Sequence, residues 1–227
     1  NEKIKEVGSI KFDAEIKNNI GLNKIISNDK FFLASSTHEG EEEIIINSYH
    51  ELLDDFPNLK LIIVPRHPER ANSVMEIFKN QKINAVIKSD LNLEKENSSA
   101  IIINATGKLD SLYDFAEIAF IGGSLFKKYG GHNLIEAAKN KCAIIVGPYM
   151  KNFEDILNLF KNENACVQIE FKSELTNAYK ELLNNNELRI NMVDNATEVV
   201  ANNRGSSDKQ FKYINDVINY EISNSNN

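Results

Sequence analysis

The sequence is poor in several features that define common protein classes. Its 227 residues include only two cysteines, Cys142 and Cys166, and each lies at the edge of an apolar, strand-like run. Such cysteines are typical of free thiols in a protein core, which argues against a disulfide or a cysteine metal site and favours a reducing, cytoplasmic setting. No stretch approaches the roughly 18–20 consecutive apolar residues of a membrane-spanning helix. The first five residues, NEKIK, hold neither an initiator methionine nor a signal peptide, so we expect the chain to be part of a longer protein.

Basic residues are also in deficit. Lysine and arginine number 26 against 33 aspartates and glutamates, a formal net charge of −7. Phosphate-backbone affinity needs a basic face, and no long basic tract is present, so we expect no nucleic-acid partner. The phosphate loop that ends in Gly-Lys-Ser/Thr is missing, and so is a Gly-x-Gly-x-x-Gly turn before the first helix. Kinase-like, GTPase-like and dehydrogenase functions therefore lose their main support. No cluster of acids and histidines has metal-ligand spacing either, so we expect no metal and no other cofactor.

What the chain does contain is a regular alternation of apolar runs and helical patterns, within a hydrophobic content of 42%. The predicted strands lie at 31–35, 60–64, 83–87, 100–103, 118–121, 142–146 and 165–169. Helices follow most of them, and three more are expected near 173–184, 187–203 and 207–222. Strands separated by helices of this length imply right-handed crossovers. We therefore predict an α/β fold, a Rossmann-like parallel sheet with helices on both faces.

We divide the chain into three parts. Residues 1–30 lack a clean period and are interpreted as a linker or the remnant of an upstream domain, with 9–13 as a short strand or part of that linker. Residues 31–205 form the domain itself. Residues 206–227 form a C-terminal helix and a polar tail that we expect to fray from 223 onward.

The most informative stretch is 119–148, which has the pattern strand, glycine loop, helix, strand. The glycines at 122–123 allow a sharp turn and close approach of the backbone to a ligand. After a second glycine pair, Asn133 and Glu136 have the spacing of a capping box, which predicts a helix start that can seat a phosphate. Glu136 has two interpretations: it caps the helix, or it accepts hydrogen bonds from two ribose hydroxyls.

A second site segment, PRHPER at 65–70, follows the strand at 60–64. Two prolines stiffen this turn and place Arg66 at a strand end, where a guanidinium suits a phosphate or a carboxylate. The alternative is that Arg66 pairs with an acid of the fold, either Glu69 or one of the acids at 39–43. His67 alone is weak support for catalysis.

Four strand-following loops are expected at one rim of the sheet, because ligands of open parallel sheets bind beyond the carboxyl ends of the strands. The helix after the first loop begins with four acids within 39–43, which its dipole explains, and we expect Ser36 and Thr37 to cap it. The four loops are 35–38, 65–70, 106–109 and 122–136.

Four motifs together resemble the C-terminal half of 3-deoxy-D-manno-octulosonic acid (Kdo) transferases: STHEGEEE at 36–43, PRHPER at 65–70, GGS at 122–124, and GGHN at 130–133 followed by Glu136. The resemblance covers about 31–205 and includes the late Asn203-Arg204-Gly205. The family usually has an acid where Lys108 stands, so the sequence departs from the family pattern there by a reversal of charge.

The resemblance implies the C-terminal half of a GT-B glycosyltransferase, in which this domain binds the donor CMP-Kdo and an N-terminal domain binds the lipid A precursor (lipid IVA) and the membrane. It implies inverting, metal-independent transfer by a parent protein at the cytoplasmic face of the bacterial inner membrane, with this part of it soluble. The general base belongs to the N-terminal domain, so no catalytic residue is expected here and the chain alone should be inactive. The donor-binding residues implied are Arg66, His67, Gly107, Lys108, Leu109, Gly123, Ser124, Asn133, Leu134, Ile135 and Glu136, with Ser36 and Thr37 near the donor sugar.

Two alternatives stay open. The first is another GT-B enzyme that uses a UDP-sugar, such as an N-acetylglucosaminyltransferase or an epimerase, since these share the glycine loop and the glutamate at the helix start. The second is a nucleotide-binding or protein-interaction module without catalysis.

Overall fold

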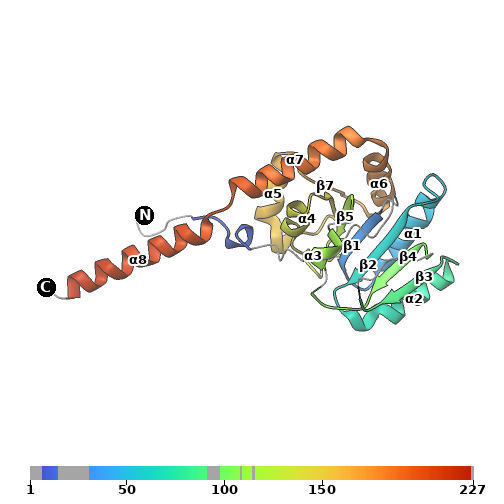
Figure 1. Ribbon diagram of the computed structural model, residues 1–227, viewed down its shortest axis with the longest axis horizontal. Coiled ribbons are helices and arrows are strands. Elements are labelled where there is room, and N and C mark those ends of the chain that lie inside the picture. The colour runs from blue at the N-terminus through green and yellow to red at the C-terminus, as the bar shows by residue number, and fades with distance from the viewer. Residues whose placement is uncertain (1–6, 15–30, 91–97, 108, 114–115, 226–227) are drawn as a thin grey trace.

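The computed structural model describes residues 7–14, 31–90, 98–107, 109–113 and 116–225, and it contains one seven-stranded, all-parallel sheet (Figure 1). The strand order is β3-β4-β2-β1-β5-β6-β7. The strands are β1 (Phe31–Thr37), β2 (Lys60–Pro65), β3 (Ala85–Lys88), β4 (Ala100–Ile103), β5 (Ile118–Ile121), β6 (Ala143–Val146) and β7 (Val167–Gln168). The α-helices are α1 (Glu41–Leu53), α2 (Ala71–Asn80), α3 (Leu109–Tyr113), α4 (Ile135–Lys139), α5 (Glu154–Asn162), α6 (Leu175–Asn184), α7 (Asn186–Asn202) and α8 (Ser206–Ser225).

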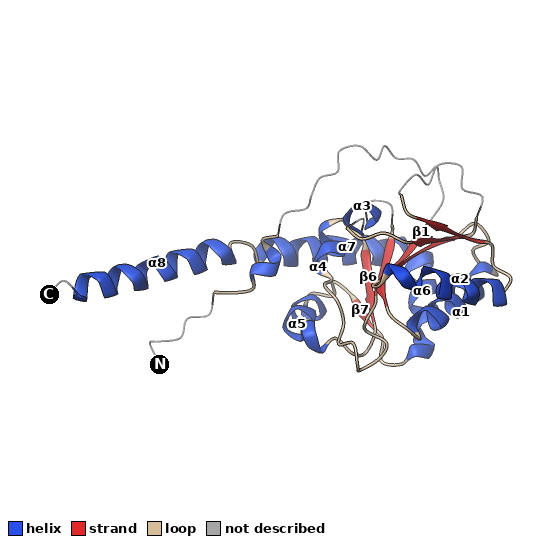
Figure 2. Ribbon diagram, turned by 90° about the horizontal axis from the view of Figure 1, so that it is seen from below, coloured by secondary structure: helices blue, strands red, loops and turns tan. Residues whose placement is uncertain are grey.

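Helices cover both faces of the sheet, and Figure 2 shows them on either side of the strands. Alternate residues of β1 point to opposite faces: Phe31 and Leu33 join one buried cluster, whereas Phe32 and Ala34 join the other. The first cluster packs the sheet against α3, α4, α5 and α7, and the second packs it against α1, α2 and α6. A strand buried on both sides reads as a continuous apolar run, which is why the sequence pattern predicted a parallel sheet. The Rossmann-like fold is therefore confirmed.

Helix α8 projects away from the sheet-containing body, as Figures 1 and 2 both show. Its start is held by Asp13, whose carboxylate accepts hydrogen bonds from the amides of Gly205 and Ser207, both at 2.6 Å. These bonds satisfy amides that have no partner inside the helix. Asp13 therefore ties the upstream segment to the C-terminal helix.

The short-strand interpretation of residues 9–13 is wrong. The segment is a 3₁₀-helix, η1 (Ile10–Phe12), in which the Ser9 hydroxyl accepts a hydrogen bond from the Lys11 amide at 3.4 Å. Phe12 is 1% exposed and packs into the first core cluster, so its side chain anchors the segment to the domain. One buried aromatic in a turn has no period that could be recognised in the sequence.

The predicted strands all exist, and their ends differ most at the two sheet edges. The strand predicted at 83–87 is observed at Ala85–Lys88, and the strand predicted at 165–169 is reduced to Val167–Gln168. Each edge strand pairs with one neighbour, β3 with β4 and β7 with β6, so its length depends on that neighbour and not on its own apolar run. The three C-terminal helices are confirmed, and α8 continues to Ser225.

The division of the chain near residues 30 and 205 stays a prediction. Three parts of the predictions lie outside the described residues: 1–6 and 15–30 of the predicted linker, the last two residues of the tail, and the predicted site residue Lys108.

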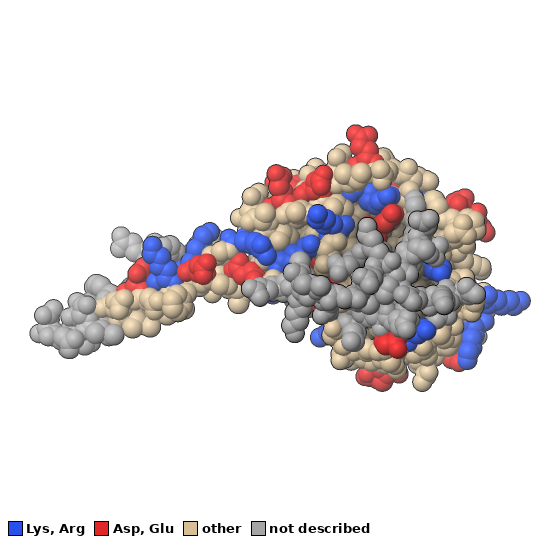
Figure 3. All heavy atoms as spheres, in the orientation of Figure 1, with Lys and Arg blue, Asp and Glu red and all other residues tan. Residues whose placement is uncertain are grey.

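Charged side chains of both signs are interspersed on the face shown in Figure 3, as a net charge of −7 from 26 basic and 33 acidic residues allows. Among the described residues, no helix combines the length and the apolar character that crossing a membrane requires.

Candidate functional site

The rim at the carboxyl ends of β1, β2 and β5 brings together loops that are distant in the sequence. The chain bulges at Ser36, which has the left-handed φ of 52°, and the β1–β2 register shifts there. On one side the amide of Arg66 donates to Thr37 O at 2.9 Å, and on the other the amide of Gly122 donates to Ser35 O at 2.8 Å. The end of β1 thus connects the PRHPER loop to the glycine loop, as the parallel-sheet argument predicted.

Glu41 holds the glycine loop in place. Its buried carboxylate accepts hydrogen bonds from the amides of Gly123 at 2.7 Å, Leu125 at 2.8 Å and His38 at 2.9 Å. Burial raises the pKa of this carboxyl, and the amides of Leu125, Gly123 and His38 oppose the rise. The sequence explanation of the acid run, a match to the helix dipole, missed this role. The signal was the position of an acid in the first turn directly behind a strand end.

Neither Ser36 nor Thr37 caps α1, so that prediction is wrong. Gly40 stands at the N-cap with φ 88°, and no side chain caps the helix. The Thr37 hydroxyl instead donates to the buried carboxylate of Glu42 at 3.3 Å. Thr37 is fully buried, whereas Ser36 is partly exposed and lines a hollow at the rim.

Several polar groups of the glycine loop form hydrogen bonds within the fold. A Cβ on Gly122 would lie 2.5 Å from Ser36 O, so glycine is required where the loop crosses the end of β1. The Gly123 amide is taken by Glu41, and the buried Ser124 hydroxyl donates to Ile121 O at 2.6 Å and accepts from the Gly147 amide at 2.8 Å. These bonds use the Gly123 amide and the Ser124 hydroxyl inside the fold, and the contact of Gly123 and Ser124 with the donor stays a prediction.

Arg66 lies beside a hollow of about 90 Å³ at the rim, together with residues from β1 and from the loop after β4. Its side chain is exposed, and among the described residues no acid pairs with it. The acid partner proposed for it belongs to another arginine: Arg70 binds Glu42 at 3.3 Å, and Glu69 lies 3.7 Å from His67. The ion-pair alternative for Arg66 is therefore wrong. The hollow is lined by Ser36, Val64, Pro65, Arg66, Pro68, Ala105, Thr106, Gly107 and Leu109.

The segment around Glu136 does not form a capping box. The Asn133 side chain accepts from the Ile135 amide at 3.1 Å, but α4 has Leu134 at its N-cap and no side-chain cap. Leu134 and Ile135 are buried in the core, so they offer a ligand their backbone groups only. Glu136 is thereby released from the capping role.

Glu136 lies among charged side chains of both signs, Lys11 and Lys139 on one hand and Asp110 on the other. It lines a hollow of about 50 Å³ with Asn133, Lys11 and Lys139, among others. Burial and the nearby charge of Asp110 raise the pKa of Glu136, whereas the Asn133 hydrogen bond and the charges of Lys139 and Arg66 oppose the rise. Glu136 and Arg66 line different hollows, of about 50 and 90 Å³.

His38, His67 and His132 form a cluster, of which the site prediction contained only His67. Nε2 of His38 lies 2.7 Å from Nε2 of His132, and the His67 ring centroid is 5.9 Å from that of His38. Tyr129 stacks on His38 at 4.1 Å. Burial, the largest cause, and the charges of His132 and His67 lower the pKa of His38 to about 4. Each histidine follows a strand or a glycine pair, which was the available signal, but their meeting depends on the sheet order.

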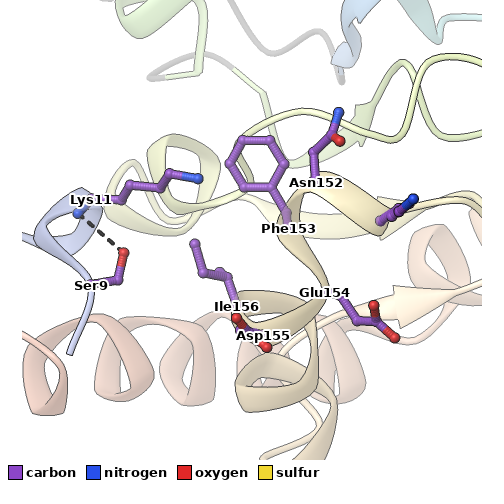
Figure 4. Close-up of a pocket in the computed structure, with 8 residues that line it drawn as sticks. Ser9, Lys11, Asn152, Phe153, Glu154, Asp155 and Ile156 are labelled. Atoms are coloured by element: carbon purple, nitrogen blue, oxygen red, sulfur yellow. Dashed lines mark hydrogen bonds between the residues drawn. The ribbon is translucent and has the colours of Figure 1, made fainter. Parts of the chain in front are cut away.

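A separate hollow of about 210 Å³ lies between η1 and the start of α5 (Figure 4). The figure shows Lys11 reaching toward Phe153, whose ring centroid lies 4.1 Å from Lys11 Nζ. None of the predicted donor-binding residues lines this hollow.

The remaining polar groups define what else the site can hold. Within the described part of the chain, no group of three or more histidine, cysteine, aspartate or glutamate side chains is arranged to hold a metal ion. Neither cysteine forms a disulfide; Cys142 is buried and Cys166 partly buried, and burial raises the pKa of Cys166 to about 12. The predictions of no cofactor and of metal-independent chemistry stay predictions.

Comparison with known proteins identifies relatives over nearly the whole chain, although no protein-family model matches it. The chain is 35% identical over 212 residues to the 3-deoxy-D-manno-octulosonic acid transferase of Haemophilus influenzae, covering 90% of this chain and 49% of that protein. It is 36% identical over 205 residues to the transferase of the same name from Rickettsia prowazekii, covering 87% of this chain and 44% of that protein. This chain thus spans about half the length of the curated relatives it matches.

A solved structure agrees with these relatives. The C-terminal CMP-Kdo binding domain of WaaA from Acinetobacter baumannii superposes with a TM-score of 0.72 at 28% identity, covering 77% of this chain and 90% of that domain. The resemblance to Kdo transferases that the four motifs predicted is therefore confirmed. The fold is that of the C-terminal domain of a GT-B glycosyltransferase.

Proposed function

We propose that this chain, a relative of the Kdo transferases, is the donor-binding domain of such an enzyme and holds CMP-Kdo at the rim of its sheet. The parent enzyme transfers Kdo from CMP-Kdo to a lipid A precursor at the cytoplasmic face of the inner membrane. The acceptor and the membrane are contacted by an N-terminal domain outside this chain, because the chain corresponds to about half of its relatives.

The observation that carries this proposal is the exposed guanidinium of Arg66, which no acid of the described residues neutralises, at the strand ends of a domain similar to a CMP-Kdo binding domain. In the fold, Glu42 pairs with Arg70, and Glu69 lies near His67. Arg66 therefore remains available for a ligand. A planar guanidinium at a strand end suits a phosphate, which it can bind through two parallel hydrogen bonds.

The rest of the rim supports the same ligand. Across the hollow from Arg66, Gly107 has a φ of 70° and leaves its Cβ position free of neighbours within 4 Å, so a flat base can approach the backbone there. Glu136, which caps nothing, is available to accept the ribose hydroxyls. Arg66 and His67 would hold the phosphate, Gly107 to Leu109 the base or ribose, and Asn133 to Glu136 the ribose side.

The chemistry follows from these contacts. Transfer from an activated sugar passes through a transition state with oxocarbenium character, and CMP leaves as an anion. Arg66 stabilises that developing negative charge electrostatically, which lowers the barrier. Inversion requires a base that removes the proton of the acceptor hydroxyl as it attacks from the opposite face, and that base belongs to the acceptor-side domain.

Calorimetric titration of the chain with CMP, UMP and UDP tests the proposal. We expect CMP to bind most tightly and Arg66→Ala to weaken it at least about tenfold, since hydrogen bonds to charged groups contribute roughly 1.5–3 kcal/mol. Lys79→Ala is the matched control, because this exposed cation pairs with Glu76 on α2. A preference for UDP would instead favour a UDP-sugar enzyme. If the parent chain binds no CMP and Arg66→Ala only impairs folding, the chain is better explained as a module with no donor site.

A further inference from the structure

His38 and His132 form a hydrogen-bonded pair at the centre of the rim. Their rings are nearly parallel, 8° apart, and the two Nε2 atoms are separated by 2.7 Å. In the neutral pair one Nε2 donates and the other accepts, and the accepting ring must then carry its own proton on Nδ1. Because no described residue bonds either Nδ1 atom, the pair presents at least one unused N–H donor. Both rings are partly exposed, so a ligand can reach them.

The charges around the pair favour an anion. The charge of Arg66 acts on both histidines and that of Arg70 acts on His38, and His67 lies on the same side. The buried acids nearby are already engaged, Glu41 by three backbone amides and Glu42 by Arg70, whereas Glu69 is exposed and lies 3.7 Å from His67. The pair therefore combines an unused donor with the nearby charge of Arg66, which no described acid neutralises.

The donor proposed above carries two anionic groups close together. Its sugar is a 2-keto acid, so one anomeric carbon bears both the phosphate oxygen and the carboxylate. Arg66 follows β2 and His132 lies in the loop after β5, on opposite sides of β1, with His38 directly after β1 between them. A site for a phosphate next to a site for a carboxylate is the arrangement such a sugar needs.

We infer that the His38–His132 pair binds the carboxylate of the donor's sugar acid and so makes the site specific for acid sugars. This inference rests on the proposed function, because it takes the phosphate to lie at Arg66. The alternative is a purely structural role, in which the pair joins the β1 loop to the glycine loop and stabilises the fold without contacting the ligand.

Comparing CMP with freshly prepared CMP-Kdo separates the two. We expect the parent chain to bind CMP-Kdo about tenfold more tightly than CMP, the contribution of one charge-assisted hydrogen bond. His132→Phe, which retains a stacked ring, and His38→Gln should lose this preference while their CMP affinity stays within about twofold. His50→Gln is the matched control, since His50 is exposed on α1 away from the rim. A second readout, the ring-nitrogen NMR signals of His38 and His132 in the parent chain, should respond to CMP-Kdo and not to CMP.

The outcomes are distinguishable. Equal affinity of the parent chain for CMP and CMP-Kdo, or variants that keep the preference, would overturn this inference and leave the CMP site intact. No binding of CMP by the parent chain would overturn the proposed function and this inference with it. If the variants fail to fold, silence of both histidine rings toward CMP-Kdo in the parent chain overturns the carboxylate role.

Discussion

The carboxylate of Glu41 accepts a hydrogen bond from the backbone amide of Gly123 at 2.7 Å, although the two residues are 82 positions apart in the sequence. The same carboxylate also binds the amides of Leu125 and His38, so one side chain of α1 sets the position of two rim loops. A buried carboxylate without such partners would be strongly destabilising, and here three amides compensate its loss of water. The geometry of the site therefore depends on a residue whose carboxylate is taken up by the backbone of the fold.

Replacing Glu41 should reduce the stability of the fold. Glu41→Ala leaves three amides of the rim without their acceptor, and we expect a loss of about 3 kcal/mol in the free energy of unfolding, since each orphaned buried group costs roughly 1–3 kcal/mol. Chemical denaturation measures this. Glu43→Ala, an exposed acid in the same first turn, is the control and should cost under about 1 kcal/mol. Equal effects of both variants would show that the helix dipole alone explains the acids.

Glu136 should affect ribose recognition and not stability. Because the structure gives it no capping bond, Glu136→Gln should leave the melting temperature unchanged. The parent chain should bind CMP about tenfold more tightly than 2′-deoxy-CMP, and the variant should lose most of that difference. Titration with both nucleotides checks this. A lowered melting temperature with intact discrimination would return Glu136 to a structural role.

The low pKa of His38 should make the fold less stable in mild acid. Burial and neighbouring positive charge lower this pKa to about 4 from an ordinary value of 6.5, and the groups responsible besides burial are His132, His67, Arg66 and Arg70. Between pH 6.5 and 4 the unfolded chain binds a proton that the folded chain refuses, so stability falls as the pH is lowered through this window.

Denaturation at pH 7 and pH 5 tests this prediction. The loss of stability on acidification should be smaller in His38→Gln than in the parent chain, with His50→Gln behaving like the parent. An NMR titration in which the His38 ring protonates near pH 6.5 would contradict it.

Acid should also loosen α8 from η1. The amides of Ser207 and Gly205 lower the pKa of Asp13 from its ordinary value of 3.8. A depressed pKa means that the stabilising contact is present above pH 3.8 and is lost as the pH falls through the folded value. Asp13→Asn should mimic that loss at neutral pH. Hydrogen exchange at Gly205 and Ser207 should quicken in this variant and stay unchanged in Asp216→Asn, an exposed acid further along α8.

The chain alone should bind the donor without transferring sugar. The acceptor site and the general base are expected in the part of the relatives that this chain does not match, about half of their length. Incubation with CMP-Kdo and lipid IVA, followed by mass spectrometry, should detect no transferred Kdo. Turnover by this chain would refute the division of labour between the two domains.

Local patterns were enough for the elements and for the loops that carry the site. The run at 60–64 and the PRHPER turn after it predicted both β2 and the position of Arg66, because an apolar strand and a proline-stiffened turn depend on neighbours in the sequence. The same reasoning failed for the caps predicted at Thr37 and, in one of its two interpretations, at Glu136. Each has the right spacing for a cap, but tertiary partners or local geometry decided otherwise.

The amino-acid sequence by itself determined the parallel sheet, the order of its elements and the four loops of the rim, because periodicity and turn chemistry act over a few residues. Only the tertiary structure decided which polar groups are used up and which stay available. In the folded protein Glu41 binds the Gly123 amide and Glu42 pairs with Arg70, whereas Arg66 has no acid partner among the described residues. The fold also brings His38 into a hydrogen bond with His132, 94 positions away in the sequence. Such pairings depend on which strands lie side by side in the sheet, and no local pattern encodes that order.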